Sequence, residues 1–188
     1  MTFSAQNLRY CHGCRKSKNA CVCSLLRPLD IPKICTAFWV HPKELDRARS
    51  TSWLTHKVIA QSLYLIEGVD EIPQGNFALL FPSEDAQAWN QVSFDGVVVI
   101  DGTWDECRAM IRRSPTLSAM PKVALCNTYQ GHYIARKAPW DGALCTMEAL
   151  GHLYLEMGNV NAQTLLDVVE ALNQRELSFK KLNKSPAM

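Results

Sequence analysis

The sequence lacks several segments and motifs that mark common protein classes. No apolar run is long enough to span a bilayer, and residues 1–10 contain no apolar core of a secretory signal. The G-x-G-x-x-G and Walker sequences, the two commonest phosphate cradles, are both absent, and so is the H-E-x-x-H motif. We therefore expect a cytoplasmic protein that does not enter a membrane and does not hold phosphate through either of those loops.

The sequence also has a low net charge and no internal repeats. The formal net charge is only +2, which permits nucleic-acid binding without requiring it, because a local basic patch matters more than the total. No internal repeat or low-complexity segment appears. What is present is an ordinary globular composition of 188 residues, 47% hydrophobic and 20% charged. That length suits one sizeable α/β domain plus a small accessory element.

Cysteine is abundant, and the reducing cytoplasm argues against disulfides. Residues 11–23 contain four cysteines in the pattern C-x2-C-x6-C-x-C. Four thiolates at this spacing predict a closed tetrahedral zinc site of structural type, with free thiols as the alternative. The candidate ligands are Cys11, Cys14, Cys21 and Cys23. The remaining cysteines are expected to be small buried hydrophobic side chains: Cys35, Cys107, Cys126 and Cys145.

Alternating strand and helix patterns predict an α/β fold. The run at 95–102, DGVVVIDG, is continuously apolar, which is typical of a strand buried on both faces of a parallel sheet. Expected strands are 33–40, 76–82, 95–102 and 121–126, and expected helices are 50–68, 83–92, 103–114, 146–158 and 161–182. We expect a mostly parallel sheet flanked by helices in residues 33–188, preceded by a zinc knuckle and connector in residues 1–32.

Unusual polar residues follow four of the expected strands, at 41–44, 81–84, 101–104 and 126–127. Ligands bind beyond the carboxyl ends of strands in open α/β sheets, so these segments predict a small-molecule or nucleotide site. A carboxylate at Asp101 can accept a proton or fix a ligand, and Gly102 lets a ligand approach the backbone. The alternative is that Asp101 caps the following helix and Trp104 belongs to the core.

A second cluster lies at 131–150, where Arg136 and Lys137 precede a turn that carries Trp140. Cations beside exposed aromatic rings suit RNA, because cations hold phosphate and rings stack on bases. The alternative is a solvated turn anchored by one tryptophan. Lys43 could extend the same positive surface.

The order of these motifs resembles the DTW-domain family. The matching segments are the cysteine knuckle, HPKE (41–44), FPSEDA (81–86), DGTW (101–104), ARKAP (135–139) and TMEA (146–149). The resemblance implies a tRNA-uridine aminocarboxypropyltransferase, which moves the 3-amino-3-carboxypropyl group of S-adenosylmethionine to N3 of a tRNA uridine. It also implies a SPOUT-like fold with a knotted cofactor pocket, related to ribosomal RNA aminocarboxypropyltransferases.

The resemblance also implies roles for individual residues. Asp101 is our candidate general base, with Glu148 as second choice, and Thr103 and Trp104 share the catalytic motif. The residues expected around the cofactor are Thr51, Leu80, Phe81, Gly102, Leu125, Trp140, Thr146 and Glu148. Those expected to contact RNA phosphate are Lys43, Arg136 and Lys137. The alternatives are an S-adenosylmethionine-dependent RNA methyltransferase and a non-catalytic zinc-containing RNA-binding module, and no oligomeric state follows from the sequence.

Overall fold

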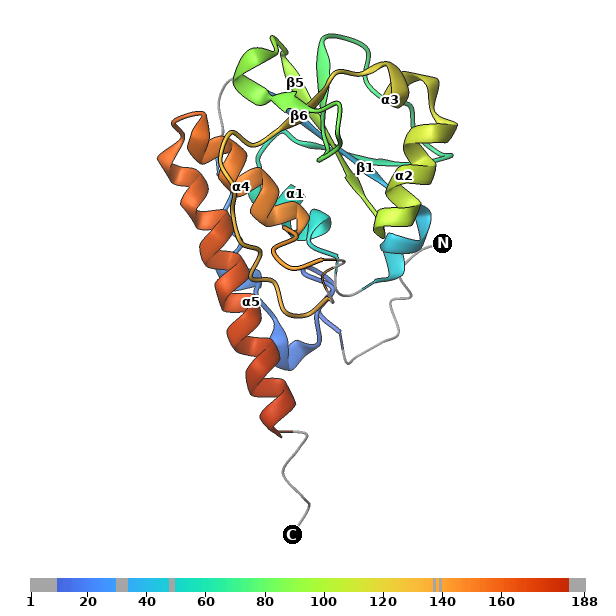
Figure 1. Cartoon of the computed structure of the whole chain (residues 1–188). Coiled ribbons are helices and arrows are strands. Elements are labelled where there is room, and N and C mark those ends of the chain that lie inside the picture. The colour runs from blue at the N-terminus through green and yellow to red at the C-terminus, as the bar shows by residue number, and fades with distance from the viewer. Residues whose placement is uncertain (1–9, 30–33, 48–49, 137, 139, 183–188) are drawn as a thin grey trace.

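A parallel sheet forms the centre of the computed structural model, which describes residues 10–29, 34–47, 50–136, 138 and 140–182 (Figure 1). Its strands are β1 (Cys35–Val40), β2 (Leu63–Ile66), β3 (Phe77–Leu80), β4 (Gln87–Ala88), β5 (Gly96–Asp101) and β6 (Lys122–Ala124). The strand order is β2-β1-β5-β3-β6-β4, and every pair is parallel. All residues of β5 are buried, as its unbroken apolar run predicted.

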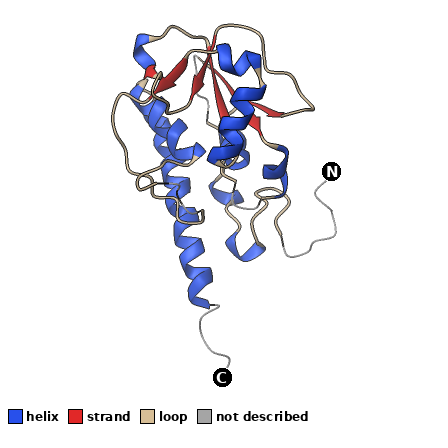
Figure 2. Cartoon of the chain, turned by 45° about the vertical axis from the view of Figure 1, so that its right-hand side comes forward, coloured by secondary structure: helices blue, strands red, loops and turns tan. Residues whose placement is uncertain are grey.

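Helices cover both faces of the sheet, so the predicted α/β class and mostly parallel sheet are confirmed (Figure 2). The helices are α1 (Ser52–Val58), α2 (Trp104–Arg113), α3 (Pro115–Ala119), α4 (Thr146–Glu156) and α5 (Gln163–Leu182). Alternate side chains of a strand point to opposite faces. Phe38 and Val99 therefore pack with α1, α4 and α5, whereas Trp39 and Ile100 pack with α2 and α3. Each fully buried aliphatic side chain contributes about 1.5–3 kcal/mol to folding.

The helix predicted at 50–68 is wrong in its second half. The helix ends at Val58, and Gln61 has a positive φ of 63° that no helix accommodates. The hydroxyl of Ser62 donates to the Ile59 carbonyl at 2.9 Å, which closes the turn. Residues 63–66 then pair with β1 as the edge strand β2. Strand pairing therefore overrides the helical spacing of the apolar residues.

The helix predicted at 83–92 is also wrong. This segment contains the short strand β4 and a single 3₁₀ turn, Trp89–Gln91. The Trp89 indole N–H donates to the Glu156 carboxylate at 2.6 Å, so the chain is held by a residue far away in sequence. Acidic residues after Ser83 resemble a helix start, but a short helix is marginal without tertiary support, and here residues 87–88 pair with β6 instead. The remaining predicted helices are present, and Pro115 begins α3 after ending the preceding pattern.

The N-terminal cysteine segment packs into the same core as the sheet. Cys14 and Val22 are fully buried in a cluster that contains Phe38 and Leu165. The Trp53 indole of α1 donates to the Gly13 carbonyl at 2.9 Å, which adds a polar tie. The division into residues 1–32 and 33–188 stays a prediction. None of the helices in the described part of the chain is long and apolar enough to cross a bilayer.

Candidate functional site

A cavity of about 560 Å³ opens at the carboxyl edge of the sheet. The ends of β3, β5 and β6 form one wall, and described residues between 125 and 145 with the start of α4 form the other, which we call the loop wall. The structure brings most of the predicted site residues to this cavity: Thr51, Leu80, Phe81, Asp101, Gly102, Thr103, Trp104, Leu125, Arg136, Trp140 and Thr146. Carboxyl ends of parallel strands share one edge, which is why segments far apart in sequence meet there.

Asp101 is the buried carboxylate of the cavity. It ends β5 and is only 3% exposed. Its Oδ2 atom accepts hydrogen bonds from the hydroxyls of Ser50 at 2.7 Å and Ser52 at 2.5 Å. Burial, followed by the nearby Glu44 charge, raises the pKa of Asp101, although the hydroxyl donors oppose the rise. The group therefore holds a proton more readily than an ordinary aspartate.

Thr103 is the N-cap of α2, so the alternative in which Asp101 caps this helix is wrong. The Glu106 N–H donates to Thr103 Oγ1 at 3.3 Å, and the Glu106 carboxylate accepts from the Thr103 N–H at 2.8 Å. This reciprocal capping box fixes the start of the helix. A Cβ at Gly102 would lie 3.2 Å from the Glu106 Cβ atom, so close packing also favours glycine there.

Three aromatic rings follow one another along the cavity. The Trp104 ring lies 5.4 Å from Phe81 and 4.4 Å from Trp140, measured between centroids. Trp140 is 46% exposed. Trp104 is partly buried, and it both packs against the core on the α2 face of the sheet and lines the cavity. The rings give the cavity an apolar surface against which a flat ligand ring can pack.

Carboxylates of α4 hold the irregular wall at 125–145. The buried Glu148 side chain accepts from the backbone N–H groups of His132 at 2.5 Å and Cys145 at 2.7 Å. Eight residues later, Glu156 accepts from the N–H groups of Cys126 and Asn127, both at 2.9 Å. Glu148 is therefore occupied by backbone donors, and its side chain does not line the cavity.

A chain of ion pairs crosses one end of the cavity. Arg136 donates to the buried carboxylate of Glu44 at 2.6 Å, and Arg47 donates to the same oxygen. Arg47 also makes a two-pronged contact with Glu106, at 3.0 and 3.2 Å. Burial opposes ionisation of Glu106, but the hydrogen bonds from Arg47 and Thr103 lower its pKa to about 2. These pairs connect segment 41–47, helix α2 and the loop wall.

Lys43, which is also predicted to contact RNA, lies outside the cavity lining. The Lys43 side chain is 71% exposed and approaches Glu106 at 4.0 Å, outside the cavity lining. Lys137 lies outside the described residues.

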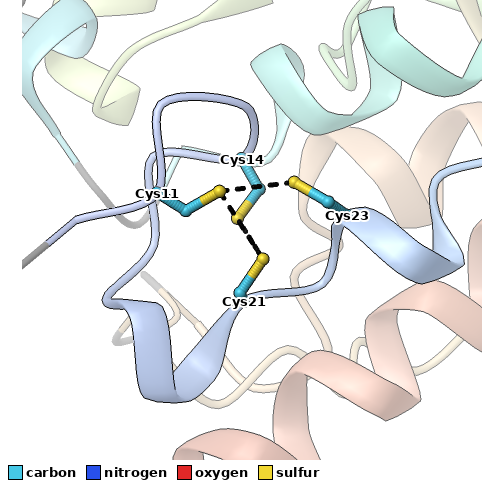
Figure 3. A group of neighbouring side chains, drawn as sticks. All are labelled: Cys11, Cys14, Cys21 and Cys23. Carbon is cyan, nitrogen blue, oxygen red and sulfur yellow. Dashed lines mark hydrogen bonds between the residues drawn. The ribbon is translucent and has the colours of Figure 1, made fainter.

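The four clustered cysteines can hold a metal ion such as zinc (Figure 3). Their sulfur atoms all lie within 4.8 Å of one another. The Cys11 sulfur is 3.5 Å from those of Cys21 and Cys23, and Cys14 is 3.7 Å from Cys21. A tetrahedral zinc ion with Zn–S bonds of about 2.3 Å places its ligands about 3.8 Å apart, so the arrangement fits. The prediction that the other cysteines are buried is confirmed for Cys107, whereas Cys35 and Cys145 are half-buried and Cys126 is exposed.

A side chain of the knuckle reaches the cavity wall. Lys16 is buried, and its ammonium donates to the Tyr133 hydroxyl at 3.3 Å. Tyr133 lines the cavity. The cysteine knuckle, defined as residues 11–23, is thereby linked to the irregular wall.

Comparison with known proteins identifies the family. The family model described as DTW domain matches residues 8–177. The chain belongs to the DTW-domain family. Two curated proteins, from Drosophila melanogaster and Macaca fascicularis, are similar to it, and both are named tRNA-uridine aminocarboxypropyltransferase 2. No solved structure matches the chain significantly.

The similarity to these relatives is partial. The Drosophila protein is 35% identical over 74 residues, which cover 37% of this chain and 30% of the relative. The macaque protein is 22% identical over 184 residues, which cover 86% of this chain and 61% of the relative. The matches therefore span less than two thirds of either relative.

For some polar residues of this DTW domain, the sequence does not predict which partners they bond or that they are buried. Ser50 and Thr51 directly precede α1, yet neither side chain caps it, and the hydroxyls of Ser50 and Ser52 donate to Asp101. Glu156 lies within an amphipathic helix, where a carboxylate is ordinarily solvated. Glu44 belongs to the HPKE motif, yet only the structure reveals its burial between two guanidinium groups.

Proposed function

We propose that the chain is a tRNA-uridine aminocarboxypropyltransferase, which moves the 3-amino-3-carboxypropyl group of S-adenosylmethionine to N3 of a tRNA uridine. Family membership and the names of the two relatives support this proposal. The observation that carries it is the position of Asp101. It is a buried carboxylate of raised pKa in the wall of a ligand-sized cavity, next to the family's Thr103 and Trp104.

The cavity suits the proposed donor in size and lining. Its volume of about 560 Å³ lies within the ordinary range for small-molecule sites. Leu80, Phe81 and Leu125 supply apolar surface, while Thr51 and Thr146 add hydroxyls and Trp140 adds a ring. When bound, the donor's sulfonium makes its attached carbons electrophilic and leaves as a neutral thioether. The residues of the cavity have to orient the amino-acid chain toward the RNA and keep the methyl group away from it.

Asp101 supplies the proton acceptor for this reaction. Uridine N3 carries a proton and becomes a good nucleophile only when that proton leaves. The proton passes from N3 to a carboxylate oxygen of Asp101, the bond from N3 to the γ-carbon forms, and the bond from that carbon to sulfur breaks. The hydroxyls of Ser50 and Ser52 fix the carboxylate orientation. The raised pKa of Asp101 favours retention of the proton until it is released to solvent.

Other parts of the molecule would serve the same reaction. A zinc ion on the knuckle would be structural, because four cysteine ligands leave no open position for chemistry. Lys43 and Lys137 remain candidates for contact with tRNA phosphate. The knotted SPOUT-like pocket and the cytoplasmic location stay predictions, and the parallel sheet with a cavity at its carboxyl edge supports the former.

Labelling of the donor tests the proposal. The purified protein is incubated with unmodified tRNA and with S-adenosylmethionine labelled either in the carboxypropyl chain or in the methyl group. Nucleosides are then analysed by mass spectrometry. We expect chain label on uridine and no methyl label. Methyl label alone would indicate an RNA methyltransferase, and tRNA binding without either label would indicate a non-catalytic module.

A further inference from the structure

Arg136 is the one cationic side chain that lines the cavity within the described part of the chain. The acidic residues that line it there are Asp101 and Asp105. The proposed donor carries a single carboxylate, at the end of the amino-acid chain that is transferred. We propose that the Arg136 guanidinium binds this α-carboxylate and that Glu44 positions the guanidinium. This inference rests on the proposed function and adds a specificity-determining residue to it.

Glu44 is built to hold Arg136 in one place. Its carboxylate is 1% exposed, and one oxygen accepts from both Arg136 and Arg47. Arg47 is in turn fixed by its two hydrogen bonds to Glu106. A buried carboxylate shared by two guanidinium groups has little freedom to move, so it presents Arg136 at a defined place on the cavity wall.

Arg136 retains donors for a ligand. A guanidinium has five N–H donors, and among the described residues the hydrogen bonds of Arg136 go to Glu44 alone. Its side chain is 32% exposed and lines the cavity. A planar guanidinium matches a carboxylate with two parallel hydrogen bonds, which gives orientation as well as affinity.

The position favours a carboxylate over an RNA phosphate, which the sequence suggested for Arg136. A phosphodiester lies within a long chain and needs a cation at an open surface, whereas a carboxylate at the end of a short chain can enter a cavity. Arg136 is also close enough to Asp101 for its charge to oppose the rise in the pKa of that carboxyl. The carboxylate anchor and the proton acceptor thus line the same cavity.

This anchor would decide which carbon reacts. During transfer the N3–Cγ bond forms and the S–Cγ bond breaks, while the carboxylate keeps its contact with Arg136 and Arg136 stays protonated throughout. A methyl transfer requires no such contact with the amino-acid chain, because that chain then stays on the sulfur.

Binding of two ligands that differ only in the carboxylate tests the inference. Isothermal titration calorimetry compares S-adenosylmethionine with decarboxylated S-adenosylmethionine. We expect the unaltered protein to bind S-adenosylmethionine about 10- to 100-fold more tightly, because the decarboxylated ligand cannot form the charged hydrogen bonds with Arg136. In R136M the ratio of the two affinities should fall to about 1. R136K keeps the positive charge but lacks the two parallel N–H donors of a guanidinium, so it should give an intermediate ratio.

Arg113→Met is the matched control. The Arg113 guanidinium pairs with Glu67 at 2.8 and 3.0 Å on α2, away from the cavity lining, so its loss should leave the ratio unchanged. If R136M does not fold, the double variant E44Q/R136M replaces it, because it leaves no buried carboxylate without its partner.

Two results would overturn the inference: equal binding of both ligands by the unaltered protein, or the wild-type ratio retained in R136M. If R136M instead weakens tRNA binding with a smaller salt dependence while keeping the ratio, Arg136 contacts phosphate. Failure of the proposed function looks different, because the unaltered protein would then bind no donor or transfer only methyl label.

Discussion

The two walls of the cavity are built in different ways. The strand wall, formed by the ends of β3, β5 and β6, is fixed by backbone hydrogen bonds between parallel strands. The loop wall consists of the described residues between 125 and 145, which form neither helix nor strand, and it is held by the side chains of Glu148 and Glu156. The strand wall places Asp101 at a position that the sheet determines, whereas the loop wall depends on individual side chains of α4 and α5, such as Glu148, Glu156 and Asn173. Substitutions in the two walls should therefore have different effects, on the reaction for the strand wall and on stability for the loop wall.

The largest expected effect is chemical and concerns the strand wall. Asp101→Asn keeps the shape of the side chain but removes the proton acceptor, so transfer to tRNA should fall by about 10²- to 10⁴-fold. The sheet should be unaffected, so the variant should unfold as cooperatively as the unaltered protein. Single-turnover transfer of chain-labelled donor measures the rate. A rate within threefold of the unaltered protein would eliminate Asp101 as the base.

The loop wall should respond in stability. Glu148→Ala leaves the N–H groups of His132, Tyr133 and Cys145 without their acceptor. Three part-buried N–H groups would lose their hydrogen-bond acceptor together, which should lower the free energy of unfolding by about 3 kcal/mol. Urea denaturation measures the change.

Glu170→Ala is the control for this variant, because Glu170 is exposed on α5 and bonds only Gln174 among the described residues. Its stability should change by less than about 0.5 kcal/mol. Similar stabilities for both variants would mean that the loop wall does not depend on Glu148.

The same contrast explains what the sequence could and could not predict. The apolar run of β5 predicted a central strand, and strands of one direction must end at one edge, so Asp101, Phe81 and Leu125 could be brought together before the structure was known. The contacts of the loop wall follow no regular spacing of residues that a sequence pattern could reveal. Glu148 was assigned to the cofactor, yet its partners are backbone groups that any residue could supply.

The errors in secondary structure have a similar origin. Residues 63–66 look helical when read together with α1, and only pairing with β1 makes them a strand. The hydroxyls of Ser50 and Ser52 suit a helix start equally well, and only the fold brings Asp101 within reach of them. Local patterns therefore identify elements, whereas the partners of buried polar groups depend on the assembled sheet.

The metal centre is connected to the loop wall through Lys16 and Tyr133. Cys21→Ser should reduce bound zinc from one ion per chain to well below one, as measured by metal analysis of the purified protein. The loosened knuckle then frees Lys16 from the Tyr133 hydroxyl, which should lower the free energy of unfolding by about 2 kcal/mol. Cys126→Ser, at an exposed thiol outside the knuckle, should keep both zinc and stability. Full zinc content in C21S would remove Cys21 from the ligand set.

The raised pKa of Asp101, on the strand wall, should make the stability of the protein depend on pH. Burial raises its pKa in the folded protein above the ordinary value of 3.8, so the folded state binds this proton more tightly than the unfolded chain. Protonated Asp101 therefore makes its whole contribution to the free energy of unfolding below pH 3.8. This contribution is lost as the pH rises through the raised pKa. Relative to D101N, the unaltered protein should lose about 1.4 kcal/mol for each unit of the rise. Urea titrations of both proteins between pH 4 and 8 measure this difference, and a constant difference would contradict the raised pKa.

The smallest expected effect lies outside both walls, at Lys43. Its side chain is largely exposed and makes only a 4.0 Å approach to Glu106, so K43M should leave folding and donor binding unchanged. If it contacts a tRNA phosphate, affinity for tRNA should fall by less than about tenfold, and the slope of log affinity against log salt should shrink by about 1. Filter binding at several salt concentrations measures both quantities, with R113M as the matched loss of an exposed cation. Equal slopes for K43M and the unaltered protein would place the RNA away from segment 41–47, and the approach of tRNA would then have to be sought along the loop wall, where Trp140 is exposed.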